Sequence, residues 1–252
     1  MHARRLYAHR GASAERPENT LAAFERAVEI GVDVLEMDVH MTRDDQLIVS
    51  HDPDGRRMAA TPLAWANLDL AEAQHLDVGW GFLAPDGTRP FAGKGIHVPR
   101  FADVLDAFPG VRINVDIKGS RAVSAMLALV SEKHAAERVT IASFQTGTAI
   151  QVRRKGYEGE TVLSQVEVIT LLGLPSMLWR ALPYTGGAAQ VPVAQGAIRF
   201  DRPAFLAKCH SLGLRVDYWV IDDPAEAKRL LDLGADGIMT NDPAAIRPVF
   251  VS

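Results

Sequence analysis

The sequence contains very little cysteine. Cys209 is the only one among 252 residues, so no disulfide can form within the chain and no zinc site can be built from cysteine side chains. Such a shortage fits a reducing cytoplasm, where we expect the protein to reside. No apolar run follows the charged residues at the N-terminus, and we therefore expect no signal peptide.

The sequence also lacks a long hydrophobic run. Its most apolar stretch, 168–182, is interrupted by Gly173, Pro175 and Arg180. A helix that crosses a bilayer needs about 20 consecutive apolar residues, so this stretch is too short and too broken. We expect no transmembrane segment, while a transient contact with a membrane surface stays open.

An excess of basic residues is missing as well. The chain has 27 Lys and Arg against 31 Asp and Glu, which gives a net charge of −4. This balance argues against a nucleic-acid partner, because such proteins generally rely on a broad basic surface. It leaves room for a small anion site built from a few local cations. The hydrophobic content of 48% is typical of a globular core.

Short apolar segments alternate with helical patterns along most of the chain, which predicts an α/β protein. No G-x-G-x-x-G or Walker pattern follows the first segment, and this disfavours an open doubly wound sheet. We therefore predict a (β/α)8 TIM barrel, a single domain over 1–252 with a small inserted subdomain at about 53–99, after the second strand. The eight predicted strands are 6–8, 34–40, 111–118, 139–144, 161–165, 188–193, 214–221 and 237–240, and 46–50 is expected to form a hairpin with the second strand.

Two carboxylates share one face of the second strand. Glu36 and Asp38 are two residues apart, and such residues point the same way in a strand. Like charges at this spacing repel each other, unless a cation lies between them or one of them keeps a proton. The alternative is an edge strand with a solvated acidic face.

Other polar residues also follow strands. In a barrel the carboxyl ends of the strands meet at one mouth, where catalytic groups lie. Each residue alone has a plain structural explanation, such as a local ion pair. Their convergence is hard to explain by stability, because buried charges are costly unless they are compensated. The candidates are His9, Arg10, Glu36, Asp38, His51, Asp52, Asp116 and Lys118.

These residue types suit one kind of chemistry. Three carboxylates, Glu36, Asp38 and Asp116, form an oxygen-rich site for a hard divalent cation. Cationic side chains suit a phosphate group, and two histidines can transfer protons near neutral pH. Together they are the parts for metal-assisted cleavage of a phosphodiester.

Several motifs in this order resemble the glycerophosphodiester phosphodiesterase family. They are Tyr7-Ala8-His9-Arg10-Gly11, Pro17-Glu18-Asn19-Thr20, Glu36-x-Asp38-Val39, Thr42-x-Asp44, His51-Asp52, Trp219 and the closing segment 234–243. The resemblance covers nearly the whole chain. It implies hydrolysis of glycerophosphodiesters to sn-glycerol 3-phosphate and an alcohol.

The resemblance also implies a role for each matching residue. Glu36, Asp38 and Asp116 would bind one divalent metal ion, Mg²⁺ or Ca²⁺, with Mn²⁺ as a further candidate. His9 and His51 would be the general acid/base pair. The remaining three would bind the substrate: Arg10 and Lys118 at its phosphate, and Trp219 as an apolar wall against the glycerol or the alcohol group.

Three positions depart from the family pattern. Asp116 stands where the family usually has Glu, and its shorter side chain leaves the choice of metal open. Val220 replaces a frequent Thr. Asn241 stands where Asp is usual, which we expect to be a structural change only.

Other functions stay open at this point. A lysophospholipid could be the substrate, as for a lysophospholipase D, if the apolar residues of 168–184 form a lip at the mouth; the plain alternative is a helix packed on the barrel. A sphingomyelinase D-like enzyme or a lyase is the nearest enzymatic rival. From another class, the chain could be a barrel that binds phosphodiesters without catalysis. The lip would contain Leu171, Leu172, Leu174, Met177, Leu178 and Trp179.

Overall fold

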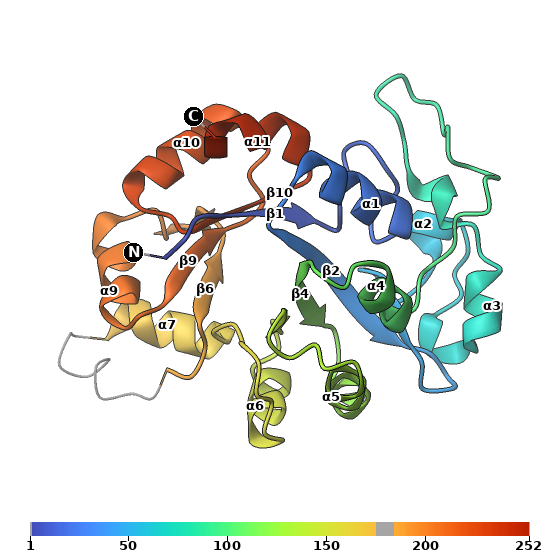
Figure 1. Cartoon of the computed structure of the whole chain (residues 1–252), viewed down its shortest axis with the longest axis horizontal. Helices are drawn as coiled ribbons and strands as arrows, with labels where there is room; N and C mark the ends of the chain where they lie inside the picture. The colour runs from blue at the N-terminus through green and yellow to red at the C-terminus, as the bar shows by residue number, and fades with distance from the viewer. Residues whose placement is uncertain (1, 175–183, 252) are drawn as a thin grey trace.

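A curled parallel sheet forms the centre of the computed structural model, which describes residues 2–174 and 184–251. Seven strands pair in the order β5-β4-β2-β1-β10-β9-β6, and every neighbouring pair is parallel. Helices surround this sheet (Figure 1). The strands are β1 Arg5–His9, β2 Val34–Met41, β4 Arg112–Ile117, β5 Val139–Ala142, β6 Ala188–Val191, β9 Arg215–Tyr218 and β10 Gly237–Thr240.

Two residues join the edges of this sheet. Thr161 forms a parallel bridge to Ile141 in β5, and Val162 forms one to Ala188 in β6. The eighth position of the barrel is therefore occupied, and the predicted α/β barrel is confirmed. The predicted strand 161–165 is too long, because Ser164 caps helix α7 (Gln165–Gly173) in a capping box with Glu167.

Helices follow the strands where the sequence has start and stop signals. Thr20 caps α1 by accepting a hydrogen bond from the Ala23 amide, and Gly31 ends this helix in a left-handed conformation. Proline occupies the first turn of three later helices, where a missing amide hydrogen has no consequence. The helices around the barrel are α1 Leu21–Ile30, α4 Phe101–Ala107, α5 Val123–Glu132, α6 Thr146–Arg154, α7 Gln165–Gly173, α9 Pro203–Ser211, α10 Pro224–Leu233 and α11 Pro243–Val251.

The segment after the second strand leaves this alternation. β3 (Leu47–Val49) pairs antiparallel with β2, as predicted for the hairpin. The next fifty residues form short helices with their own apolar cluster, centred on Trp65, and lie beside the barrel (Figure 1). We propose that 53–99 is an inserted subdomain of a single barrel domain. Its helices are α2 Arg56–Ala59, η1 Trp65–Asn67, α3 Leu70–Gln74 and η2 Val78–Gly81.

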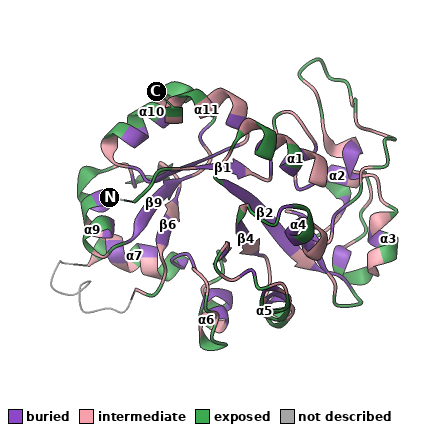
Figure 2. Cartoon of the chain, viewed as in Figure 1, coloured by how far each residue is buried: buried purple, intermediate pink, exposed green. Residues whose placement is uncertain are grey.

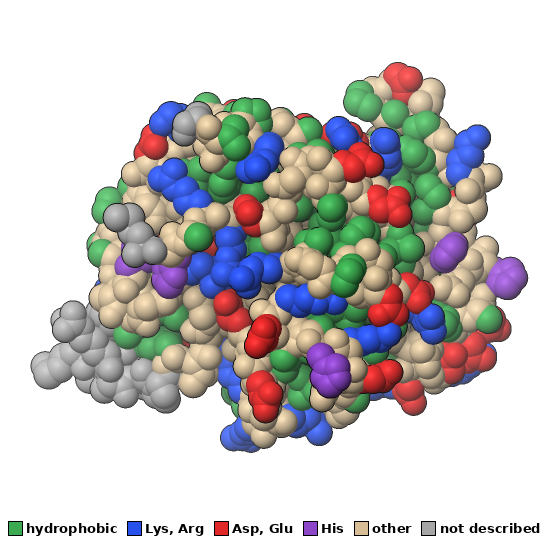
Figure 3. Space-filling view, in the orientation of Figure 1, with side chains coloured by type: hydrophobic (Ala, Val, Ile, Leu, Met, Phe, Trp, Pro, Cys, Tyr) green, Lys and Arg blue, Asp and Glu red, His purple; other side chains and the backbone are tan. Residues whose placement is uncertain are grey.

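The buried residues lie on the strands and on the helix faces that pack against them (Figure 2). One large cluster gathers around β2, β4 and β5 and another around β6, β9 and β10. Burial of one such large apolar side chain contributes about 1.5–3 kcal/mol. Basic and acidic side chains are mixed on the face in Figure 3, in keeping with the small net charge. Among the residues that the structure describes, no helix is long and apolar enough to cross a membrane.

A small hairpin that the sequence patterns did not predict follows β6. Its strands are only two residues each, β7 Ala194–Gln195 and β8 Ile198–Arg199. Such short strands leave no period in the sequence from which to identify them. The hairpin matters because Gln195 and Ile198 contribute to the cavity described next.

Candidate active site

A cavity of about 330 Å³ opens at the carboxyl ends of the strands. Its walls include all eight residues for which the sequence predicts a role. The structure therefore brings together side chains that lie as far apart in the chain as His9 and Trp219, and their individual roles stay predictions. The eight are His9, Arg10, Glu36, Asp38, His51, Asp116, Lys118 and Trp219.

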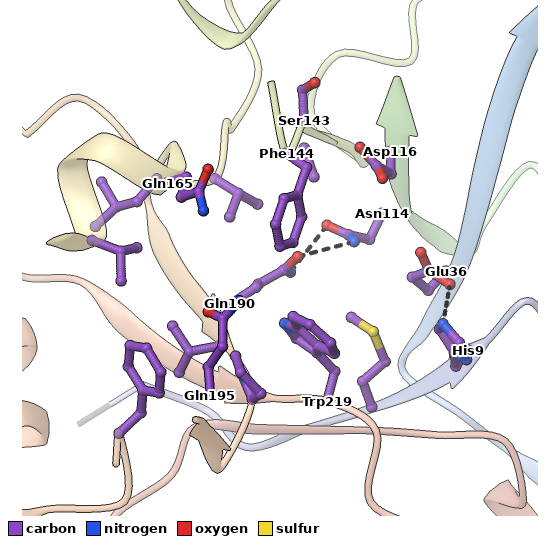
Figure 4. A pocket seen from close by; sticks show the side chains of 18 of the residues that line it. His9, Glu36, Asn114, Asp116, Ser143, Phe144, Gln165, Gln190, Gln195 and Trp219 are labelled. Atoms are coloured by element: carbon purple, nitrogen blue, oxygen red, sulfur yellow. Dashed lines mark hydrogen bonds and ion pairs between the residues drawn. The ribbon is translucent and has the colours of Figure 1, made fainter. Parts of the chain in front are cut away.

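The lining of this cavity changes character along the chain. All seven ionisable lining residues lie between His9 and Lys118, and those from Ala142 onward are uncharged. Figure 4 shows His9 and Glu36 on one side, and Phe144 and Gln165 across the cavity from them. The cavity thus has a charged half and an apolar half. The apolar half contains Ala142, Phe144, Val162, Leu163, Val168, Ile169, Leu172, Val191, Pro192, Ile198, Phe200, Trp219 and Met239.

The register of the sheet assembles the three carboxylates. Glu36 and Asp38 are both buried on β2, and Asp38 pairs in parallel register with Asp116 on β4. The Lys118 ammonium lies between these two aspartates, with Nζ 2.7 Å from Asp38 Oδ1 and 2.7 Å from Asp116 Oδ2. Glu36 has its partner elsewhere, since its Oε2 accepts a 3.0 Å hydrogen bond from the Arg10 backbone amide.

Burial and neighbouring charges act differently on these carboxylates. Burial, reinforced by Asp38, raises the pKa of Glu36 well above its usual value. Burial also raises the pKa of Asp116, although Lys118 opposes this effect. For Asp38 burial acts in the same direction, but Lys118 and Arg10 outweigh it and lower the pKa. The site therefore brings three carboxylates, those of Glu36, Asp38 and Asp116, together with two cations, Arg10 and Lys118.

This donor set can be compared with what a metal ion requires. Among the residues that the structure describes, no group of three or more His, Cys, Asp or Glu side chains stands ready to hold a metal. Lys118 occupies the place between Asp38 and Asp116, yet Asp116 Oδ1 is buried without a hydrogen-bond partner. Three clustered carboxylates, one with an unused oxygen, fit a hard divalent cation once the flexible lysine side chain moves aside.

The turn after β1 has an unusual backbone. Arg10 and Asn19 both have positive φ, 58° and 56°, a conformation that is uncommon for residues other than glycine. Gly11 must stay small, because a Cβ there would lie 2.7 Å from the backbone and side chain of Ala23. This packing explains the glycine that follows His9 and Arg10, and in the same turn the Arg10 amide donates to Glu36.

The two histidines have different partners. His9 Nδ1 lies 2.7 Å from Asn241 Oδ1, and its Nε2 is 4.0 Å from Glu36 Oε2. Burial and the charge of Arg10 lower the pKa of His9. His51 Nδ1 instead lies 2.8 Å from Asp52 Oδ1. In both residues Nδ1 is engaged, which leaves Nε2 for the cavity.

Arg57 of the insertion contacts two segments that carry site residues, the turn after β1 and the segment after β3. The sequence analysis did not identify it. Arg57 binds the Glu18 carboxylate with two nitrogens, at 2.7 and 2.8 Å, and donates from Nε to Asp52 at 2.7 Å. Glu18 also binds Arg10 Nη1 at 3.0 Å, while Asp52 contacts His51. Arg57 lies in α2, a helix of four residues that is too short for a period to single it out. Glu18 could have been found, because it belongs to the Pro-Glu-Asn-Thr motif.

The sequence analysis also missed a pair of amide side chains, Asn114 and Gln190, which lies between the charged and the apolar half of the cavity. Asn114 and Gln190 exchange two hydrogen bonds across the barrel, of 3.2 and 3.1 Å (Figure 4). Asn114 could have been noticed, since it shares a strand face with Asp116. Its partner lies 76 residues further along the chain, and only closure of the barrel brings the two together.

The chain was compared with known proteins. A model of the glycerophosphoryl diester phosphodiesterase family matches residues 9–245. A lysophospholipase D of Mus musculus is 29% identical over 96% of this chain and 85% of that protein. A glycerophosphodiester phosphodiesterase of Caldanaerobacter subterraneus is 28% identical over 96% of this chain and 95% of that protein.

A solved structure supports the fold. An Oleispira antarctica phosphodiesterase, in complex with its product sn-glycerol-3-phosphate, superposes with a TM-score of 0.81 and covers 99% of this chain and 98% of that one. At 19% identity this likeness speaks for the barrel alone.

Proposed function

Because this chain belongs to the glycerophosphoryl diester phosphodiesterase family and is thus a phosphoric diester hydrolase, we propose that it converts glycerophosphodiesters to sn-glycerol 3-phosphate and an alcohol. The observation that carries this proposal is the convergence of seven ionisable side chains on one cavity at the strand ends. The same product is bound in the Oleispira antarctica protein of this fold.

Arg10 and Lys118 would bind the phosphate. Arg10 lines the cavity, and its Nε is paired with Asp38 Oδ2 at 3.2 Å and its Nη1 with Glu18 at 3.0 Å, so its positive charge is held beside the proposed phosphate position. Lys118 now binds Asp38 and Asp116 at 2.7 Å each; with a metal ion on these carboxylates its ammonium would move aside, and its three donors could turn to the phosphate. Both cations would then offset the negative charge that develops on the phosphate during cleavage.

A divalent metal ion would be held by Glu36, Asp38 and Asp116. When bound, it would polarise the phosphate and lower the pKa of a coordinated water or substrate hydroxyl. The protein supplies the buried carboxylates of Glu36 and Asp38 and the half-buried one of Asp116, whose like charges favour such a cation. The Arg10 amide fixes the direction of the Glu36 carboxylate.

His9 and His51 would transfer the protons. One imidazole takes a proton from the attacking water or substrate hydroxyl, and the other gives a proton to the oxygen of the departing alcohol. If the hydroxyl attacks, a water must then open the cyclic phosphate to give sn-glycerol 3-phosphate. Each has Nδ1 bound to a protein oxygen and Nε2 left for the cavity. The insertion contributes through Arg57, which holds the Asp52 partner of His51.

The test is an assay with glycerophosphocholine in the presence of Mg²⁺, Mn²⁺ or Ca²⁺. We expect release of sn-glycerol 3-phosphate that depends on the metal. Accumulation of a stable cyclic phosphate instead would favour a lyase. Binding without turnover of this diester or of bis(p-nitrophenyl) phosphate would favour a barrel that binds phosphodiesters without catalysis.

The apolar half of the cavity favours a second candidate substrate, a lysophospholipid. Within the suggested lip, Leu171 is fully buried in the barrel core, whereas Leu172 lines the cavity together with Ile169. Met177, Leu178 and Trp179 lie outside the described residues. One face of helix α7 thus packs on the barrel, as in the plain alternative, and another face lines the cavity, as a lip would require. The Mus musculus relative is named for this activity.

A charge on this wall should separate the two substrates. Ile169 is 57% exposed at the cavity, so Ile169→Asp should fold. We expect kcat/KM for lysophosphatidylcholine to fall about 10-fold, because contact with one large apolar side chain contributes about 1.5 kcal/mol. Activity on glycerophosphocholine should stay within about 2-fold, since the charged half is untouched.

The matched control is Ile150→Asp. Ile150 lies on α6, is also exposed at 41% and does not line the cavity. Equal losses in the two variants, or equal losses on the two substrates, would argue against an apolar lip.

A further inference from the structure

The side chain of Asn241 lies between His9 and Asp222. Its Oδ1 is 2.7 Å from His9 Nδ1, and its Nδ2 donates to Asp222 Oδ2 at 2.9 Å. Resting on the proposed function of His9, we propose that Asp222 and Asn241 are positioning residues that hold the neutral His9 ring with its proton on Nδ1. The sequence analysis had treated Asn241 as a structural replacement only.

Asp222 determines which way the amide of Asn241 faces. Its carboxylate is exposed, and an ionised carboxylate only accepts hydrogen bonds. Oδ1 accepts from Thr240 Oγ1 at 2.8 Å and from the Asn241 backbone amide at 2.7 Å. With the carboxylate held by these two bonds, the NH₂ group of Asn241 must face Oδ2, and its carbonyl oxygen must face His9.

The orientation of the amide in turn determines the tautomer of His9. A carbonyl oxygen accepts hydrogen bonds and cannot donate one. The contact of 2.7 Å is therefore favourable only when Nδ1 carries the proton. The other tautomer would place two lone pairs against each other and leave the oxygen of a half-buried amide without this donor. Ser13 Oγ lies 3.2 Å from the same oxygen, but its single hydrogen has the His9 carbonyl as a closer acceptor at 2.9 Å, so Ser13 does not take the place of the Nδ1 proton.

The consequence for catalysis concerns Nε2. With the proton on Nδ1, the Nε2 lone pair is free on the side where Glu36 and the cavity lie (Figure 4). That is the nitrogen which must accept or return a proton in the proposed reaction. In His51 the Asp52 carboxylate contacts Nδ1 directly, which also leaves Nε2 for the cavity. In His9 the neutral amide of Asn241 lies between the ring and Asp222.

The experiment uses Asp222→Asn with Asp223→Asn as the matched control. Asp223 is the neighbouring exposed aspartate and only caps helix α10 through the Ala225 amide. In the first variant the new amide oxygen is held by the Thr240 hydroxyl and the Asn241 backbone amide, so its NH₂ group faces the Asn241 side chain and favours turning the Asn241 oxygen away from His9. We expect kcat to fall about 10- to 100-fold, as for other lost partners of functional histidines, with KM nearly unchanged. The control should resemble the unchanged protein.

The direct readout is ¹⁵N NMR of the histidine rings at a pH where His9 is neutral, its signals being identified by their absence in His9→Asn. The unchanged protein should show a protonated Nδ1 and an unprotonated Nε2. Asp222→Asn should shift His9 toward the tautomer with the proton on Nε2, because the Asn241 NH₂ group would then face Nδ1. Asn241→Ala removes the partner of Nδ1 and should show averaged shifts of the two tautomers. It serves if the first variant does not fold, since Asp222 keeps its bonds to Thr240 and to the backbone of residue 241.

An Nε2-protonated His9 in the unchanged protein would overturn the proposal. So would an unaltered His9 spectrum in the variants. The NMR result does not depend on turnover, so a chain that hydrolyses no diester but shows the expected tautomer would contradict the proposed function and leave this inference standing.

Discussion

Alanine in place of His51 is expected to lower kcat by about 10²- to 10⁴-fold, the usual contribution of a general acid or base. His51 is held for this role, because its Nδ1 contacts Asp52 and Arg57 binds the other oxygen of Asp52. The fold should survive, since the His51 side chain is 36% exposed and belongs to none of the buried apolar clusters. His9→Ala should have an effect of the same order.

The measurement is kcat at saturating glycerophosphocholine, with circular dichroism to verify folding. His97→Ala is the control, because His97 is an exposed histidine of the insertion whose only hydrogen bond in the described structure is to the Gly95 carbonyl. Full activity of either the His9 or the His51 variant would refute the acid/base assignment.

Glu36→Gln is expected to have opposite effects on activity and on stability. Loss of one of three proposed metal ligands should lower kcat about 10³-fold, which corresponds to about 4 kcal/mol of transition-state stabilisation. Without metal, however, the variant should unfold at an equal or higher temperature. Burial and Asp38 disfavour the Glu36 carboxylate and raise its pKa, and a neutral amide removes that repulsion.

Isothermal titration with Mg²⁺, Mn²⁺ and Ca²⁺ and thermal unfolding with and without EDTA measure both effects. The unchanged protein should gain more stability from metal than the variant, because a ligand stabilises the state that binds it. EDTA should abolish turnover, and added metal should restore it. Metal binding of equal strength in both proteins would exclude Glu36 as a ligand.

The sequence was informative where neighbours in the chain decide the outcome. Glu36 and Asp38 share a face because side chains alternate along a strand, and Thr20 begins a helix because its hydroxyl accepts a hydrogen bond from the Ala23 amide. The strand predicted for 161–165 was too long because the capping residue Ser164 follows directly. A local signal was present there, and the apolar pattern concealed it.

The features of the site that could not be predicted from the sequence depend on contacts between distant segments. The position of Lys118 between two aspartates follows from the pairing of β2 with β4 and from the conformation of a flexible side chain. The contacts of Arg57 depend on how the insertion packs on the barrel. Asn241 reaches His9 only because the last strand, β10, lies beside the first.

The division of the cavity at Lys118 has an evolutionary consequence. The groups proposed to bind and cleave the phosphate come from one continuous stretch of sequence, and the apolar wall comes from the stretch that follows. Mutation, or recombination near the middle of the gene, can therefore alter the preferred alcohol while the residues for bond cleavage are inherited together, provided that Asp222 and Asn241, which contact His9 from the C-terminal half, are kept. Such an arrangement lets related enzymes diverge in substrate without reinventing their chemistry, and it marks the C-terminal half as the part to exchange when a new alcohol specificity is sought.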